Sequence, residues 1–145
     1  MTLPKPEVGL VIRYSYLWAD EHAIGAEEGK KDRPCAVVVA QRRDDDHLIV
    51  TVFPITHSPP TNADDAVELP NVLKRHLGLD GERSWLVVTE TNSFIWPGPD
   101  LRPIPDAKPT RFHYGMLPPR FVRYALDKYD AAFALRRLRI VKRTD

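Results

Sequence analysis

Pro34-Cys35-Ala36-Val37-Val38-Val39-Ala40 is a continuous apolar run, which predicts a buried central strand over residues 34–40. A polar turn with three aspartates follows it, and residues 48–53 predict the next strand, which ends at Pro54. Further short segments rich in strand-favouring residues lie on both sides of this pair, at residues 8–16, 66–69, 85–89, 94–96 and 112–116. The chain is therefore expected to be mainly β.

Residues from Pro118 onward predict the one convincing helix, because proline is tolerated in a first helical turn. Apolar residues recur there at spacings of three and four: Val122, Ala125, Leu126, Tyr129, Ala132 and Phe133. Residues 70–77 predict only a helical turn, and residues 19–32 a long polar loop. We expect about six or seven short strands closed by a C-terminal α-helix, in a small, partly open barrel.

Length and composition indicate one globular domain, residues 1–145. Of the 145 residues, 43% are hydrophobic and 28% are charged, which is ordinary usage for a chain that buries a core. Neither a membrane span nor a secretory signal is expected, since no apolar run reaches about 18 residues and no basic segment precedes an apolar one at the N-terminus. The single cysteine, Cys35, cannot form an internal disulfide. Together these features favour the cytoplasm.

The charge is unevenly distributed along the chain. The net charge is only +1, but residues 111–145 hold nine Lys or Arg against three Asp or Glu. A basic end of this kind is typical of a nucleic-acid contact, and it is equally typical of the solvated face of a helix. Composition leaves both interpretations open.

Polar residues stand at three predicted strand ends: Arg33 before the strand at 34–40, Thr56, His57 and Ser58 after the strand at 48–53, and Glu90, Thr91 and Asn92 after the strand at 85–89. If these strands are neighbours, the side chains converge on one rim. An arginine fork suits phosphate oxygens, while a hydroxyl and an imidazole can handle protons. The alternative is ordinary: Arg33 pairs with Asp32 or Glu28, Thr56 caps a turn, and His57 is an exposed loop residue.

Several classes of site are not expected. No two of the five histidines are three to five residues apart, and one cysteine cannot supply a structural zinc site. The run Asp44–Asp46 is better explained as a solvated turn, and the glycines lack the spacing of a phosphate-binding loop. The sequence therefore predicts no metal and no cofactor.

Several segments together resemble the MazF/PemK toxin family. Gly9-Leu10-Val11-Ile12 and Asp32-Arg33-Pro34 followed by the apolar run are similar to the opening of that family, and Phe53-Pro54-Ile55-Thr56-His57-Ser58 is similar to its next block. Residues 85–92 and Tyr114-Gly115-Met116-Leu117-Pro118 resemble its later blocks, in the same order over about residues 8–137. The loop at 18–31 is longer than usual, residues 97–109 are an insertion, and no glutamine stands in the turn at 90–92.

The resemblance implies an SH3-like or plasmid-toxin barrel that forms a homodimer, acts as a metal-independent endoribonuclease and is inhibited by a cognate antitoxin. Single-stranded RNA would be cut at specific sequences, leaving a 2′,3′-cyclic phosphate and a 5′-OH. The catalytic residues implied are Arg33 and Thr56, with Ser58 assisting and His57 as a weaker candidate for the general base.

Expected RNA contacts are Trp18 and Trp96 by base stacking, Arg42 and Arg43 on phosphates, and Asn92 at the third strand end. Each has a structural alternative, since the aromatic rings can fill the core and the arginines can belong to a solvated turn. Two other functions stay open. One is a CcdB-like barrel that binds a protein such as gyrase, and the other is an inactive barrel that binds nucleic acid or protein.

Overall fold

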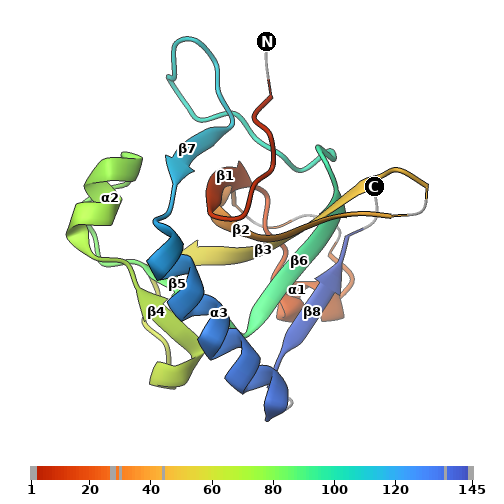
Figure 1. The fold of residues 1–145 in the computed structure, drawn as a ribbon, viewed down its shortest axis with the longest axis vertical. Coiled ribbons are helices and arrows are strands. Elements are labelled where there is room, and N and C mark those ends of the chain that lie inside the picture. Colours follow the sequence, from red (N-terminus) through yellow and green to blue (C-terminus); the bar gives the residue numbers. More distant parts are fainter. Residues whose placement is uncertain (1–2, 27–28, 30, 44, 136, 144–145) are drawn as a thin grey trace.

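The computed structural model describes residues 3–26, 29, 31–43, 45–135 and 137–143 (Figure 1). Over these residues the chain forms, in order, β1 (Leu10–Tyr14), α1 (Ala19–Ala23), β2 (Arg33–Arg42), β3 (Leu48–Thr56), the 3₁₀ turn η1 (Ala63–Asp65), β4 (Ala66–Glu68), α2 (Asn71–Leu77), β5 (Trp85–Val87), β6 (Glu90–Ile95), β7 (His113–Met116), α3 (Pro119–Ala134) and β8 (Arg139–Lys142). The prediction of a mainly β chain with a helix near its C-terminus is confirmed.

The long antiparallel hairpin of β2 and β3 forms the centre of the sheet. Its register runs from Cys35 opposite Pro54 to Arg42 opposite Leu48, with a bulge between Val37 and Val39. Strand β3 continues past Pro54, although we expected it to end there. Its other edge pairs with β6 through Val52 and with β5 from Ile55 onward. Pro54 therefore lies at the change of partner, where the missing N–H disrupts the ladder least.

The sheet is open rather than closed. Its strand order is β4-β5-β3-β2-β1-β7, with β6 beside β3 and β8 running parallel to β6. Within the described residues, β4 and β7 do not pair, so the hydrogen bonds do not close the predicted barrel. Helices occupy this interval, because α2 contacts β7 and α3 contacts β4 (Figure 1). Packed side chains, rather than paired strands, therefore fill the interval between β4 and β7.

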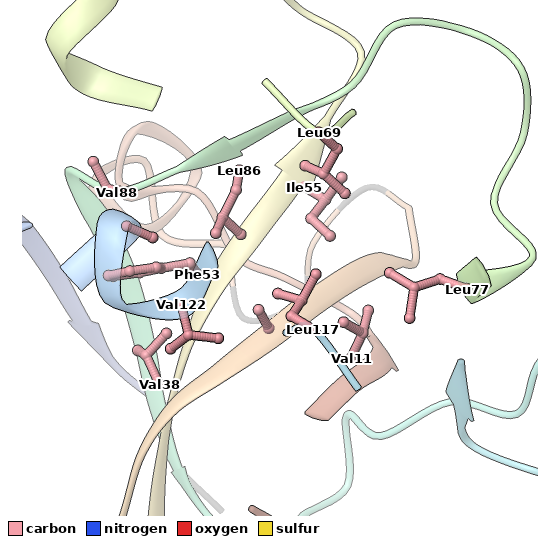
Figure 2. Packing of buried hydrophobic residues seen from close by; sticks show 12 residues of the cluster. Val11, Val38, Phe53, Ile55, Leu69, Leu77, Leu86, Val88, Leu117 and Val122 are labelled. Carbon is pink, nitrogen blue, oxygen red and sulfur yellow. The ribbon is translucent and has the colours of Figure 1, made fainter. Parts of the chain in front are cut away.

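Both faces of β2 are buried, which accounts for its continuous apolar run. Val38 belongs to one cluster, in which Val122 of α3 points toward it and toward Phe53 (Figure 2). Cys35 and Val37 face the other way, into a second cluster with Tyr14 and other apolar residues of β1, β3 and β6. A strand enclosed on both faces shows no alternation of polar and apolar residues.

Helix α3 lies where the sequence predicts a helix, but two details differ. Val122, Ala125 and Ala132 are buried as expected, whereas the Phe133 ring is 64% exposed. The chain also does not end on this helix. Strand β8 follows it and inserts Val141 beside Leu17 in a third small cluster.

The proline-rich segment at 97–109 covers part of the second cluster. Leu101 forms an isolated bridge with Tyr14, and the Asp100 carbonyl accepts the Ser15 N–H at 2.9 Å. None of the helices within the described ranges is long and apolar enough to cross a membrane.

Candidate functional site

Two cavities meet at the end of the central hairpin. The first measures about 280 Å³ and is lined by residues from β1, β2, β3 and the segment after α2. The second measures about 580 Å³ and extends toward α1 and β6. Both are lined by the same four residues, Lys31, Arg33, Thr56 and His57. These four side chains form the wall between the cavities.

The hairpin brings Arg33 and Thr56 together. Arg33 is the first residue of β2 and Thr56 is the last of β3, and the antiparallel register places the two strand ends side by side. The Nη1 atom of Arg33 donates to the Ile55 carbonyl at 3.5 Å. The expectation that polar strand ends share one rim therefore holds for these two residues.

The Arg33 guanidinium is half-buried and poorly satisfied. Its Nε atom is buried and has no hydrogen-bond partner in the described part of the chain, and the group lies 5.0 Å from the centre of the Trp18 ring. Burial lowers the pKa of Arg33, which nevertheless stays protonated because arginine does not lose its proton in proteins. The expected partner Asp32 instead lies 3.5 Å from Arg102, and Glu28 is outside the described residues. Among the described residues Arg33 therefore makes one hydrogen bond, to the Ile55 carbonyl, and it lines both cavities.

Thr56 both caps a turn and lines the cavities. Its Oγ1 atom accepts the N–H of Ser58 at 3.2 Å, as the structural alternative predicts. A hydroxyl that accepts one hydrogen bond keeps its own proton as a donor. Ser58 itself is exposed and lines only the second cavity.

His57 lies in the wall with both ring nitrogens occupied. Nδ1 lies 2.8 Å from the Arg83 carbonyl oxygen, and Nε2 lies 2.9 Å from an Asp80 carboxylate oxygen. A second carboxylate, that of Glu82, is 3.6 Å from Nε2. Both ring nitrogens of His57 therefore face acceptors of the protein rather than a substrate. Sequence spacing did not identify these partners, because a polar loop more than 20 residues away supplies them.

Glu90 is a half-buried acid in the second cavity. One of its oxygens accepts the Ala19 N–H at 2.9 Å. Burial raises the pKa of the Glu90 carboxyl above its usual range, and Asp20 adds to this, although the Ala19 N–H and Arg139 act in the opposite direction. A raised pKa in a cavity that holds a cation is typical of a functional acid or base.

Asn92 is completely buried, so the expectation that it contacts RNA is not supported. Its side chain accepts the Leu17 N–H at 2.9 Å and donates to the Leu17 carbonyl at 2.8 Å. Its oxygen also accepts from Arg143 at 3.0 Å. This polar side chain holds the segment after β1 against β6 and β8.

The other expected RNA contacts lie in two separate parts of the molecule. Trp18 lies at the site, against Arg33, whereas Trp96 lines a separate cavity with Arg42 at the far end of β2. Nine residues of strand separate Arg42 from Arg33, which is about 30 Å. Arg43 is bound to Asp45 at 2.9 Å. The structure therefore does not bring Arg42, Arg43 or Trp96 to the cavities at Arg33.

Comparison of the sequence with protein-family models and with curated proteins finds no match to either.

What the site can do follows from its own groups. Lys31 and Arg33 give the shared wall positive charge, and Thr56 adds a hydroxyl donor between the two cavities. A planar guanidinium and a hydroxyl directed at one space can hold two oxygens of a phosphodiester. Trp18 and the second cavity offer apolar surface on one side of that phosphate.

Proposed function

We propose that the protein is an endoribonuclease of the MazF/PemK type, the toxin of a toxin–antitoxin pair, with the plasmid-toxin barrel in an open form. The observation that supports this most is Arg33, a half-buried cation beside Thr56 whose Nε has no partner among the described residues. Burying an arginine is costly, and a bound anion would offset that cost. An RNA phosphate is the ligand that the resemblance implies.

The chemistry requires little of the protein, because RNA carries its own nucleophile. The 2′-OH oxygen loses its proton as it attacks the adjacent phosphorus, and the bond to the 5′-oxygen breaks. The leaving 5′-oxygen takes up a proton from solvent, so that a 2′,3′-cyclic phosphate and a 5′-OH result. Arg33 stabilises the charge that develops on the phosphate oxygens, and Thr56 donates to one of them. Ser58 stands near enough in sequence to assist at the same edge.

Glu90 is our candidate for accepting the 2′-OH proton. It lines the same cavity as Arg33 and Thr56, and its raised pKa makes its carboxylate a stronger base than an ordinary glutamate. His57 is the candidate that the sequence offers, but both its nitrogens have partners. A proton that Glu90 takes up can pass to solvent through the open side of the cavity.

The proposed partners are single-stranded RNA, a second copy of the chain and an antitoxin. Large apolar side chains remain exposed at several places: Val8, Val72, Tyr124, Phe133, Leu135 and Ile140. Surfaces of this kind suit a two-fold dimer or a bound antitoxin segment.

Cleavage of a long single-stranded RNA in the presence of EDTA tests the nuclease. We expect discrete fragments with 2′,3′-cyclic phosphate ends. Arg33→Ala should reduce the cleavage rate by about 10²–10³-fold, the loss typical of one preorganised donor. Arg33→Lys should not restore it, because an ammonium lacks the planar fork.

The matched control is Arg123→Ala, which removes the same charge from an exposed position on α3. It should cleave at the wild-type rate. Intact RNA with the wild-type protein would contradict the nuclease and favour the CcdB-like or inactive binding alternatives. Full activity of Arg33→Ala would remove Arg33 from the mechanism.

A further inference from the structure

Three potential metal ligands converge beside the first cavity, which two of them, His57 and Asp80, also line. They are His57 at the end of β3 and Asp80 and Glu82 in the loop that follows α2. One ligand atom from each lies within 4.8 Å of the other two. The Nε2 atom of His57 is 2.9 Å from Asp80 and 3.6 Å from Glu82.

A main-chain carbonyl outside this cluster fixes the orientation of the His57 ring. Its Nδ1 atom lies 2.8 Å from the main-chain carbonyl of Arg83, which can only accept, so Nδ1 carries a proton. In the neutral imidazole the other nitrogen, Nε2, then presents a lone pair. That lone pair faces two carboxylates, which also only accept. A proton on Nε2 would satisfy the contact with Asp80, and a metal cation would satisfy the nitrogen and both carboxylates together.

The contact that His57 makes through Nδ1 is of the kind that metal-binding histidines make. A ligating histidine donates its other N–H to a carbonyl or carboxylate, which fixes the tautomer and the direction of the lone pair. The Arg83 carbonyl supplies this contact for His57, and the Ser84 hydroxyl lies 3.3 Å from the same nitrogen.

A second histidine cluster on the surface shows the contrast. His47 lies 3.1 Å from Asp45, much as His57 lies beside Asp80. There the third member is Arg43, whose guanidinium is 3.1 Å from His47 and 2.9 Å from Asp45. That cluster contains its own cation. At His57 the third member is another carboxylate, so the positive charge comes either from a proton on the imidazole or from a bound cation.

The loop that carries the two carboxylates is held in place before any ion binds. The buried Lys74 ammonium donates to the Glu82 carbonyl, and the Glu82 N–H donates to Asp80 at 3.0 Å. Arg83 forms a two-pronged ion pair with Glu68 at 2.8 Å. The ligand atoms therefore need only small side-chain movements to surround an ion.

We propose that His57 Nε2, Asp80 and Glu82 bind one zinc ion, with water completing the coordination. Zinc takes one imidazole nitrogen and carboxylate oxygens at about 2.0–2.2 Å, which puts neighbouring ligand atoms roughly 3–3.5 Å apart. The separations of 2.9 and 3.6 Å about Nε2 are close to this range. Magnesium, which prefers oxygen ligands alone, suits the site less well.

The ion links the loop after α2 to the end of β3. Because Thr56 directly precedes His57, the ion also holds Thr56 in position, although it does not contact the Thr56 hydroxyl. The inference stands independently of the proposed nuclease, since it rests on the His57 cluster alone. It also revises the sequence-based expectation of no metal site, because residues 23 and 25 positions apart from His57 complete the cluster.

The test is a titration of the full-length, tag-free, metal-stripped protein with Co²⁺, followed by visible absorption, and then displacement by Zn²⁺. We expect one equivalent to bind. Asp80→Asn and Glu82→Gln should each weaken binding by at least ten-fold. The amide introduced by Asp80→Asn keeps an oxygen that can accept the Glu82 N–H, so the loop should stay folded. Both carboxylates are largely exposed, which also favours intact folding.

The matched control is Asp45→Asn, which removes the same charge beside His47, where Arg43 already supplies the cation. It should bind Co²⁺ as the wild type does. A second readout is thermal unfolding, in which Zn²⁺ should raise the midpoint of the wild type and not of Asp80→Asn. Absence of saturable binding, or equal losses in Asp45→Asn and Asp80→Asn, would overturn the site. Neither measurement involves RNA, so a failure to bind metal is distinguishable from a failure of the proposed nuclease activity.

Discussion

Arg33 and Glu90 show how single residues can be held in costly states at this site. The arginine is half-buried without an ion-pair partner in the described chain, and the glutamate is half-buried with a raised pKa. Each costs folding free energy relative to an exposed position, because burial disfavours the charged form of both groups. Two half-buried charged groups that line one cavity are typical of a functional site, because packing alone would favour uncharged residues at both positions.

Glu90→Gln should stabilise the protein at neutral pH but not at acid pH. The pKa of Glu90 is higher in the folded state than in the unfolded state. Its contribution to stability is therefore present below the unfolded pKa and is lost as the pH rises through the folded pKa. A glutamine does not titrate, and its amide oxygen can still accept the Ala19 N–H.

Urea unfolding of both proteins between about pH 4 and pH 8 measures this difference. The free energy of unfolding of the variant should rise relative to that of wild type as the pH increases. Glu7→Gln, at an exposed position, is the control and should show no such trend. A difference that stays constant over the whole range would contradict the assignment.

The elements divide into those that the sequence predicts and those that it does not. Strand β2 is predictable because both of its faces are buried, which leaves a long apolar run, and α3 because its apolar residues recur at helical spacing. Strand β8 is not predictable, since only Val141 of Arg139–Lys142 is buried. Residues 139–142 form a strand because they pair with β6, and a short stretch of sequence does not show which distant strand it will pair with.

The candidate site divides in the same way. Arg33 and Thr56 are predictable because they end the two strands of one hairpin. Glu90 also stands at a strand end that the sequence singles out, but its contact with Ala19 is made at long range. Asp80 and Glu82 come next to His57 only through long-range contacts. The sequence does not reveal that Asn92 is buried, because polar residues at strand ends are usually exposed, whereas this one satisfies main-chain groups of Leu17.

Arg143→Ala tests how β8 is fastened. The Arg143 guanidinium is almost fully buried, lies 2.8 Å from the Asp100 carboxylate and donates to the Ser15 carbonyl at 2.8 Å. Removing one member of a buried ion pair typically costs about 3–5 kcal/mol, and Arg102, 3.9 Å from Asp100, compensates the remaining charge only in part. Chemical denaturation should show a loss of stability of that size.

Lys142→Ala is the matched control, since it removes an equal charge from the adjacent, exposed residue. It should change the free energy of unfolding by less than about 0.5 kcal/mol. Equal effects of the two substitutions would mean that the ion pair with Asp100 does not hold the C-terminal strand.

At the scale of the whole molecule, the structure separates two groups of positive charge. Lys31 and Arg33 lie at the cavities, while Arg42 and Arg43 lie in the turn at the other end of the hairpin and are bound to aspartates. RNA that follows the cavities would meet the first group and not the second. Several basic residues near the C-terminus belong to α3 and β8, and Arg143, which follows β8, is structural.

Charge reversal distinguishes the two groups. Lys31→Glu should weaken RNA binding and reduce the dependence of affinity on salt, because each phosphate that a protein neutralises on a single strand contributes about 0.7 to the slope. The double variant Arg42→Glu with Arg43→Glu should leave that slope unchanged. Binding measured from about 50 to 200 mM salt decides between them. The reverse result would move the RNA path to the far end of the hairpin.

The pairing of β1 with β7 also governs when the protein can fold. Arg13 and Tyr114, 101 positions apart, share a hydrogen bond, and Arg143 reaches Ser15 across 128 positions. Contacts of such sequence separation must overcome the entropy of closing long loops, so folding is slow compared with that of local structures. During synthesis the hairpin of β2 and β3 can form early, but β1 has no outer partner until β7 leaves the ribosome. Arg33 and Thr56 therefore come together well before the cavities around them are complete.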